Sequence, residues 1–295
     1  MGIDLAAAVS FMAMHARQLD GRRFELVLGG GDRDGVLAAL EAYRNRDGGY
    51  GRGLEPDLRS IESQPGAALH AFEVLAEVGP QTTCRSVELC DWLGSISLPD
   101  GGLPFALPVT NPAGCAPFWV DADPTVSSLQ ITAIVAANAH RVARHDSDVA
   151  RHPWLATATR HCLEAIAALN DAPHALVLAF SVQFLDAVHD TVPEAKALME
   201  HLGRHVPAEG RVHVDGGTAE EFVRPLDFAP ETNRPGRSLF AAEVVEADLT
   251  RLASLQQPDG GWPVEWMTYS PAATLEWRGY LTVRAVSILR HRAAR

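Results

Sequence analysis

The stretch QQPDGGW (residues 256–262) contains an Asp-Gly-Gly tripeptide that occurs four times in the 295-residue chain. The copies begin at Asp47, Asp100, Asp215 and Asp259, so their successive spacings are 53, 115 and 44 residues. The middle spacing is about two periods, and a unit of about 50 residues has the length of two helices with their connections. Helical repeats bury a continuous core only when several units stack. The repeat therefore predicts an array of helical hairpins.

Three copies share a context, because each follows a helical pattern and precedes an apolar or aromatic residue. They are YRNRDGGYG (residues 43–51), SISLPDGGLPF (95–105) and LQQPDGGWPVEW (255–266). Either glycine of a copy, Gly261 among them, can take a positive φ and end the helix, while the aspartate can accept hydrogen bonds from the turn's own backbone. The fourth copy, in residues 211–221, does not share this context, and we interpret it as an unrelated turn.

Helical periodicity runs through most of the chain. Apolar residues recur at three- and four-residue spacings, as in residues 67–78, 127–142 and 175–188, and no run shows sustained alternation of apolar and polar residues. Proline and glycine lie mainly between these stretches, where they mark turns. The pattern predicts an all-α protein that folds as one domain over residues 1–295.

The charge of the chain restricts its partners. The formal net charge is −12 at pH 7, whereas nucleic acids and anionic membrane surfaces are bound through clustered Lys and Arg. No stretch approaches the roughly 18 apolar residues that span a bilayer, and the first residues lack a basic leader. We expect a cytoplasmic protein that does not cross a membrane and binds no nucleic acid.

Residues 256–262 resemble the Q-x-x-D-G-x-W repeat of squalene-hopene and oxidosqualene cyclases, known as the QW motif. The copies at 43–51 and 95–105 are similar but degenerate, with Tyr50 and Leu103 where the tryptophan would stand. In that family the Gln and Trp tie the end of one helix to the next. The resemblance implies the α/α toroid of the terpenoid cyclase and protein prenyltransferase superfamily, a ring of about six helical hairpins in a chain of this length. The same toroid hosts lanthipeptide cyclases and carbohydrate-active enzymes, so it does not fix the function.

A second resemblance concerns the acid of class II terpene cyclases, which lies in an Asp-x-Asp-Asp-Thr-Ala segment. Residues 121–126 read DADPTV, in which Asp121 matches the first aspartate, Asp123 matches the acid and Pro124 replaces the third aspartate. The family's acid protonates an alkene or epoxide, so it must be buried and hydrogen-bonded to stay protonated at neutral pH. The resemblance implies that Asp123 is the proton donor and that Asp121 supports it.

The same segment also has a structural interpretation. Asp123 followed by Pro124 matches an N-cap with proline at the first helical position, so it predicts the start of a helix. The two roles are compatible, since the acid of the family also precedes a helix. Phe118 and Trp119, just upstream, fit either ordinary packing or an aromatic wall that stabilises a cation.

Two further groups are candidates for substrate binding. One is the aromatic side chains near the C-terminus, Trp262, Trp266, Tyr269, Trp277 and Tyr280. Such residues are expected either in the core or in a pocket lining. The other group is Glu55 and Asp57, in the Gly- and Pro-bounded loop of residues 51–66. This loop is either a solvated turn or the rim of a pocket with acidic ligands.

Motifs that bind cofactors and metals are missing from the sequence. It has no DDxxD segment for a magnesium diphosphate, no P-loop or GxGxxG before a helix, no GxSxG and no CxxC pair. We therefore expect neither a metal nor a cofactor.

The sequence favours a metal-independent, terpenoid-cyclase-like enzyme that cyclises a small hydrophobic isoprenoid, with Asp123 as the acid. Bacterial class II cyclases have two toroids, whereas 295 residues suffice for one, which leaves room for a homodimer or a partner domain. Two alternatives stay open. One is a non-catalytic binding or scaffolding toroid, and the other is a carbohydrate-processing toroid that uses carboxylates such as Glu55 and Asp57, about 5–10 Å apart across a cleft.

Overall fold

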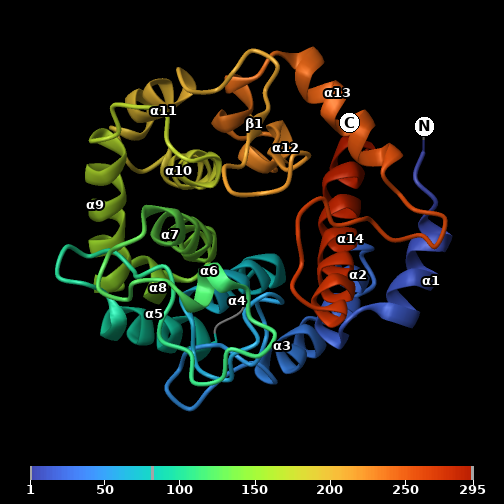
Figure 1. Cartoon of the computed structure of the whole chain (residues 1–295), viewed down its shortest axis with the longest axis horizontal. Helices are drawn as coiled ribbons and strands as arrows, with labels where there is room; N and C mark the ends of the chain where they lie inside the picture. Colours follow the sequence, from blue (N-terminus) through green and yellow to red (C-terminus); the bar gives the residue numbers. More distant parts are fainter. Residues whose placement is uncertain (1, 81–82, 294–295) are drawn as a thin grey trace. The chain divides into compact units, whose positions relative to one another are not determined.

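The computed structural model describes residues 2–80 and 83–293. Within these ranges it contains fourteen α-helices, one 3-10 helix and one two-stranded sheet (Figure 1). The prediction of an all-α protein is confirmed. The chain divides into two compact units, Met1–Ala39 with Val206–Arg295 and Leu40–His205. The helix α3 (Arg33–Glu41) runs across the boundary between them.

The unit of residues 40–205 is built around α7. Its helices are α4 (Pro65–Val78), α5 (Cys84–Ile96), α6 (Pro117–Val120), α7 (Leu129–Ala143), α8 (Ser147–Ala150), α9 (Pro153–Ala167), α10 (Ala175–Val188) and α11 (Ala195–Gly203). Helix α7 packs against α4, α9 and α10, and residues 131–139 are all buried. Four alanines in this stretch let the neighbouring helices approach closely. Pro65 at the first position of α4 needs no hydrogen-bond partner there, which fixes where that helix begins.

The other unit joins the two ends of the chain. It contains α1 (Leu5–His15), α2 (Gln18–Val27), β1 (Val212–His213), β2 (Phe222–Val223), α12 (Pro225–Phe228), the 3-10 helix η1 (Pro235–Leu239), α13 (Ala242–Ser254) and α14 (Pro271–Ala293). Helix α14 packs against α1, α2 and α13. Phe11, Phe24, Trp262 and Val286 lie in the buried cluster between these helices. The hydrophobic core of this unit therefore needs residues from both ends of the sequence.

Three of the Asp-Gly-Gly copies form the same turn. The second glycine donates its backbone N–H to Oδ1 of Asp47, Asp100 or Asp259 over 3.0, 3.0 and 3.1 Å. The first glycine has a positive φ of 91°, 88° and 93° at Gly48, Gly101 and Gly260. The next residue is fully buried in each copy: Tyr50, Leu103 and Trp262. The turn thus follows the end of one helix by a few residues and places the next side chain in the core.

The fourth copy is a different turn, as its sequence context predicts. It connects β1 to β2, which pair antiparallel with Val212 opposite Val223. Here Gly217 donates its N–H to the carbonyl of Val214 over 3.0 Å. This copy shares the positive φ at its first glycine, 79° at Gly216, but it follows a strand and joins a hairpin, so it has no helix to end.

Gly261 is constrained by packing rather than by its backbone angles. The positive φ in this turn lies at Gly260 and not at Gly261. A Cβ added to Gly261 would lie 2.7 Å from the ring of Phe11, too close for any side chain. The turn therefore needs both glycines, but for two different physical reasons.

Gln256 and Trp262 connect three elements of this unit. The Gln256 amide accepts the backbone N–H of Asp4 over 2.8 Å and donates to the Asp4 carbonyl over 2.8 Å. The Asp4 side chain in turn caps α1 by accepting the N–H of Ala7. The indole N–H of Trp262 donates to the carbonyl of Leu252, in α13, over 2.8 Å. The end of α13 is thereby tied to the start of α1.

Removing this connection should weaken the unit measurably. Gln256→Ala deletes two hydrogen bonds to Asp4 and one to Gly260, so we expect a loss of about 1–2 kcal/mol in the free energy of unfolding. Gln257→Ala is the matched control, because Gln257 is exposed and its amide bonds the nearby Leu255 carbonyl. Urea titration of both variants would test this, and equal losses would contradict it.

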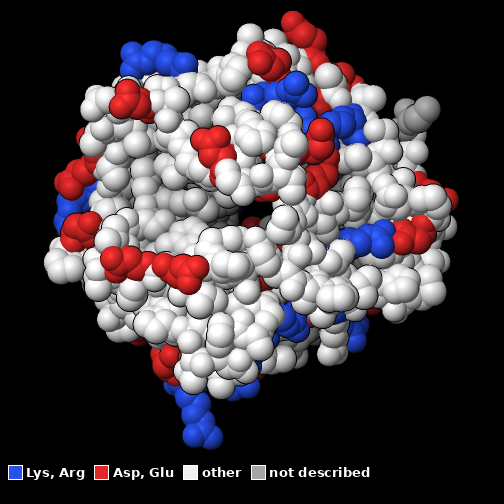
Figure 2. Space-filling view, viewed as in Figure 1, with Lys and Arg blue, Asp and Glu red and all other residues white. Residues whose placement is uncertain are grey.

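Charged residues are dispersed over the surface. On the face shown in Figure 2, Lys and Arg side chains lie singly or in small groups among Asp and Glu side chains. Along residues 2–80 and 83–293, no helix combines the length and the apolar character needed to cross a membrane.

Candidate functional site

The long connection between α5 and α7 packs onto the loop that precedes α4. The side-chain amide of Gln64 accepts the N–H of Leu107 over 2.8 Å and donates to the Leu107 carbonyl over 3.1 Å. Further along, the N–H of Ala116 donates to the carbonyl of Asp57 over 2.8 Å. These bonds place the loop that carries Glu55 beside the start of α6.

A hydrogen-bonded chain of three side chains lies in this region. His70 Nε2 bonds Glu55 Oε2 over 2.8 Å, and His70 Nδ1 bonds Glu73 Oε2 over 2.9 Å. The side chains of Glu55 and His70 are 8% and 9% exposed, whereas that of Glu73 is 20% exposed. The other oxygen of Glu55 accepts the N–H of Asp57 over 3.1 Å, which fixes the orientation of the carboxylate. The Glu55–His70–Glu73 chain therefore has a closed end at Glu55 and a more accessible end at Glu73.

His70 is cationic at neutral pH. Burial lowers its pKa, but the charge of Glu73 and the hydrogen bonds to Glu55 and Glu73 outweigh burial and raise the pKa from 6.5 to about 9. Both ring nitrogens then carry a proton and both donate. The two glutamate side chains therefore both accept a hydrogen bond from the same imidazolium.

Aromatic side chains cover the neighbouring turn of α4. The rings of Phe105 and Trp119 stack with centroids 4.5 Å apart, and Phe118 packs against Trp119 at 5.5 Å. A Cβ added to Gly66 would lie 3.0 Å from the Trp119 ring, so this ring rests directly on the helix. Gly66 and His70 are four residues apart and share one face of α4. The ring of Trp119 therefore touches α4 about one turn before His70. The rings of Phe105, Phe118 and Trp119 are here called the aromatic cluster.

One polar atom of the aromatic cluster is buried without a partner. Trp119 is 7% exposed, and within the described part of the chain its indole Nε1 has no hydrogen-bond partner. A buried donor usually finds an acceptor, because leaving it unpaired costs about 1–3 kcal/mol. The unpaired N–H is enclosed by protein atoms, so it is a local cost to stability and does not face a ligand.

Glu55 and Asp57 do not form the carboxylate pair of a glycosidase. They lie two residues apart on one buried loop, and the N–H of Asp57 bonds the Glu55 carboxylate. A glycosidase needs its two carboxylates on facing sides of the scissile bond. The partner of Glu55 is His70.

The structure does not bring Asp121 and Asp123 into this cluster. Both are exposed, with Asp121 ending α6 and Asp123 in the turn that follows. Asp123 Oδ1 accepts the hydroxyl and the N–H of Thr125 over 2.6 and 2.8 Å, and these bonds lower the pKa of the carboxyl. An exposed carboxylate with a lowered pKa is ionised at neutral pH, whereas an acid that protonates an alkene must be protonated.

The prediction that Asp123 caps a helix is wrong. Helix α7 begins only at Leu129, and its cap is Ser128, whose side chain accepts the N–H of Ile131. Asp123 and Pro124 instead belong to a turn that is closed by the Thr125 hydroxyl. The Thr125 hydroxyl and backbone N–H both bond the Asp123 side-chain oxygen that would otherwise cap a helix. This local turn forms in place of the helix start.

The C-terminal aromatic residues form a cluster in the other unit. Trp277 lies between Trp266 and Tyr280, with centroids 5.2 and 5.4 Å away in T-shaped contacts. The guanidinium of Arg23 lies 5.2 Å from the centroid of the Tyr280 ring. Tyr269 lies in the connection before α14 and is partly exposed. Trp262 is separate from this cluster and belongs to the hydrophobic core.

Sequence reasoning missed His70, Glu73 and Phe105. Residues 70–73 read HAFE, and a His and a Glu three apart on a helix share a face, which was a usable signal. The bond from His70 to Glu55 joins a helix to a preceding loop, and spacing alone does not reveal it. Phe105 lies in the long connection, where no periodicity predicts which side chains turn inward.

Metal ligation does not explain the site. Throughout residues 2–80 and 83–293, no group of three or more His, Cys, Asp or Glu side chains is arranged to hold a metal ion. Glu55 and Glu73 bond opposite nitrogens of the His70 ring, so their bonded oxygens lie on opposite sides of it.

The chain matches no model of a known protein family and no curated protein. The functional argument therefore depends on the geometry of the site.

Proposed function

We propose that the protein is an acid–base enzyme in which the Glu55–His70–Glu73 chain exchanges a proton with a small apolar substrate beside the aromatic cluster. The observation that carries this proposal is the pair of hydrogen bonds that hold one imidazolium between two carboxylates. A proton held on a buried histidine can pass to either carboxylate with little movement. Glu73, at the more accessible end, is the group that meets the substrate.

The proposed reaction is an isomerisation, so its atoms balance without a co-reactant. His70 carries the proton at rest, and Glu73 receives it when it shifts along their hydrogen bond, which leaves His70 neutral. Glu73 then gives this proton to an alkene or epoxide of the substrate. The resulting cation closes a ring or rearranges, and a neighbouring carbon then returns a proton to the Glu73 carboxylate. The carboxylates of the chain and the ring faces of the aromatic cluster favour the cationic intermediate.

An isoprenoid is the substrate class that suits the surface next to the site. Phe118 and Val120 are 48% and 37% exposed on the short helix α6. Exposed apolar side chains beside a buried polar group provide binding area for a hydrocarbon chain. This assignment keeps the terpenoid-cyclase-like activity expected from the sequence but replaces Asp123 as the acid with the Glu55–His70–Glu73 chain.

We also propose that the helical hairpins are arranged in a ring, the α/α toroid. It is supported by the three equivalent Asp-Gly-Gly turns and by the Gln256 connection between α13 and α1. A ring of hairpins needs its last helices to meet its first, and α14 packs against α1 and α2.

Turnover of linear isoprenoids tests this function. Wild type, Glu73→Gln, Glu77→Gln and Asp123→Asn would be incubated with linear isoprenoid alkenes and epoxides, and the extracts analysed by mass spectrometry. We expect cyclised or rearranged products from the wild type and a loss of about 100-fold or more in Glu73→Gln, because an amide cannot deliver the proton. Glu77→Gln is the matched control, since Glu77 is exposed on the same helix.

Each other outcome contradicts part of the proposal. Products formed equally by Glu73→Gln would exclude the Glu55–His70–Glu73 chain as the acid, and their loss in Asp123→Asn would assign the acid to Asp123. Absence of products from every substrate would favour a binding or scaffolding role. Circular dichroism of each variant would exclude unfolding as the cause of a loss.

A further inference from the structure

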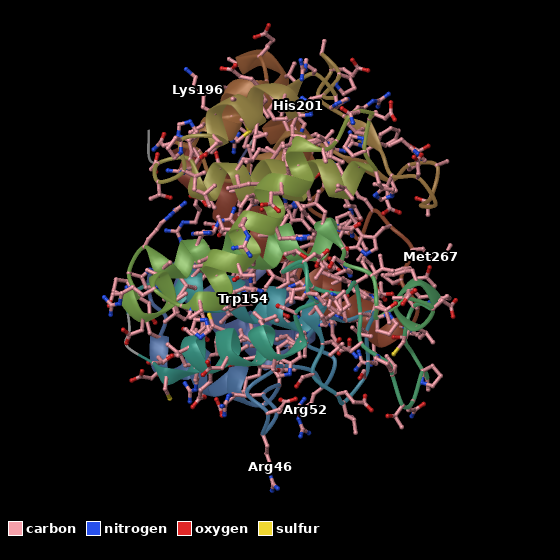
Figure 3. The ribbon with its side chains drawn as sticks, turned by 90° about the vertical axis from the view of Figure 1, so that its left-hand side faces the viewer. Arg46, Arg52, Trp154, Lys196, His201 and Met267 are labelled. Carbon is pink, nitrogen blue, oxygen red and sulfur yellow. The ribbon has the colours of Figure 1, made fainter. Side chains whose placement is uncertain are left out.

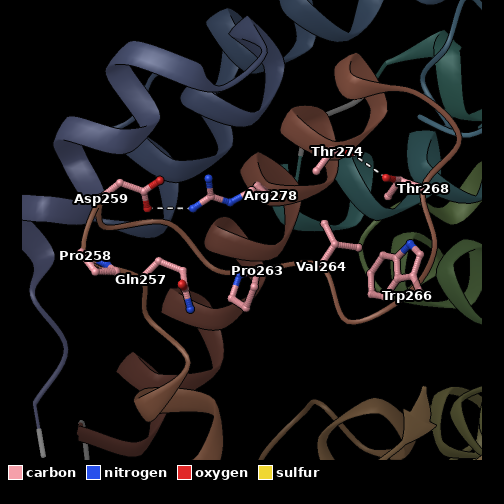
Figure 4. A pocket seen from close by; sticks show the side chains of 9 residues that line it. All are labelled: Gln257, Pro258, Asp259, Pro263, Val264, Trp266, Thr268, Thr274 and Arg278. Carbon is pink, nitrogen blue, oxygen red and sulfur yellow. Dashed lines mark hydrogen bonds and ion pairs between the residues drawn. The ribbon is translucent and has the colours of Figure 1, made fainter. Parts of the chain in front are cut away.

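A pocket of about 490 Å³ lies in the unit that contains α13 and α14, between the Asp-Gly-Gly turn at Asp259 and α14 (Figure 4). Its volume is within the usual range for small-molecule sites, about 300–1,000 Å³. All of its lining residues come from residues 257–278. The pocket belongs to one unit and contains no residue of the Glu55–His70–Glu73 chain, so any role it has is independent of the proposed acid–base reaction.

The aromatic side of the pocket is Trp266. Its ring makes a T-shaped contact with the buried Trp277, at a centroid distance of 5.2 Å and an interplanar angle of 83°. Such a contact covers at most one face of the Trp266 ring. Since Trp266 is partly exposed and lines the pocket, the rest of its surface is available to a flat apolar face of a ligand.

Two threonine hydroxyls lie beside Trp266. Thr268 Oγ1 and Thr274 Oγ1 are 2.6 Å apart, and Thr274 Oγ1 also lies 3.1 Å from the carbonyl oxygen of Ser270. Either hydroxyl can be the donor in the contact between the two threonines. In both cases the oxygen of Thr268 keeps a lone pair that can accept a hydrogen bond from a ligand hydroxyl.

The opposite side of the pocket is polar but electrically balanced. Arg278 Nη2 pairs with Asp259 Oδ1 over 2.7 Å, and Arg278 Nε donates to the Trp262 carbonyl over 3.3 Å. The side-chain amide of Gln257 donates to the Leu255 carbonyl over 2.9 Å, which leaves its oxygen and second N–H for other partners. A cation and an anion that neutralise each other do not select a charged ligand, but they supply donors and acceptors.

We infer that this pocket binds a neutral saccharide, with a pyranose face on Trp266 and hydroxyl groups bonded to Thr268, Gln257 and the Asp259–Arg278 pair. A pyranose combines an apolar C–H face with closely spaced hydroxyls that both donate and accept. The pocket offers the complementary arrangement: one ring face, and polar groups with no net charge at the opposite side.

Binding of simple sugars tests this inference. The probes are maltose, cellobiose and chitobiose, each titrated at millimolar concentration into the full chain while the indole N–H signals are followed by NMR. We expect at least one of them to shift the Trp266 signal and to saturate. Trp266→Ala should then weaken the affinity about 10-fold or more, Thr268→Val less, and Trp266→Phe least.

Met267→Ala is the matched control. Met267 adjoins Trp266 in the same connection, is 59% exposed and does not line the pocket (Figure 3). Met267→Ala should leave the affinity for the sugar unchanged. Glu73→Gln should also leave it unchanged, and this result would distinguish the sugar site from the proposed acid–base site. Absence of any shift of the Trp266 signal, equal weakening by Met267→Ala, or a response to glucuronate or inorganic phosphate alone would overturn the inference.

Discussion

Replacing Gly260 with alanine is expected to lower the free energy of unfolding by about 3 kcal/mol or more. Gly260 has a φ of 93°, which costs an L-residue about 1–2 kcal/mol. An added Cβ would also lie 2.1 Å from the carbonyl oxygen of Ala7. This oxygen belongs to the backbone of α1 and cannot move aside alone, so overpacking adds about 1–3 kcal/mol.

Gly216→Ala separates the two contributions. Gly216 belongs to the fourth Asp-Gly-Gly copy and has a similar φ of 79°, but an added Cβ would meet nothing within 4 Å. We expect this variant to lose only the backbone part, about 1–2 kcal/mol. Chemical denaturation of both variants measures the difference. Equal losses would show that the turn at Gly260 does not pack against α1 as described.

The stability of the protein should fall as the pH rises from about 6.5 to about 9. His70 has an unfolded pKa near 6.5 and a folded pKa of about 9, so the folded state binds the proton more tightly. The resulting stabilisation is fully present below the unfolded pKa and is lost as the pH rises through the folded pKa. A difference of this size corresponds to at most about 3 kcal/mol. Urea titrations at several pH values would measure the loss.

An NMR titration assigns this effect to His70. Glu55→Gln removes one of the two carboxylates that raise the pKa, so the imidazole signals of His70 should titrate at a lower pH in this variant than in the wild type. His140 is the internal control, because burial and then the charge of Arg144 lower its pKa to about 4. A His70 that titrates near 6.5 in the wild type would exclude the charged chain.

Local features of the fold could be predicted from the sequence. The three Asp-Gly-Gly turns depend on residues within a few positions of one another, so their context was sufficient to separate them from the fourth copy. The need for glycine at position 261 was not predictable, because the steric limit there comes from Phe11, about 250 positions away.

The candidate site was predicted only in part. Glu55, Asp57, Phe118 and Trp119 were named as candidates, and the structure places them in one region because residues 104–119 pack onto residues 55–66. The role of Asp123 was inferred from a matching pattern, but a pattern carries no information on burial, and this carboxylate is exposed. The partner of Glu55 depends on how a loop packs against α4, which periodicity does not encode.

The union of the two chain ends in one unit sets an order of folding during synthesis. Residues 1–39 leave the ribosome before residues 40–205, whereas their core partners in α13 and α14 are made after residues 40–205. Residues 40–205 form a compact unit of their own and can fold while the rest is still being translated. Until α14 emerges, Phe11 and Phe24 lack the surface that buries them. If translation stopped before α14, residues 40–205 would be folded while the apolar side chains of residues 1–39 stayed exposed. Chaperones bind such exposed apolar segments.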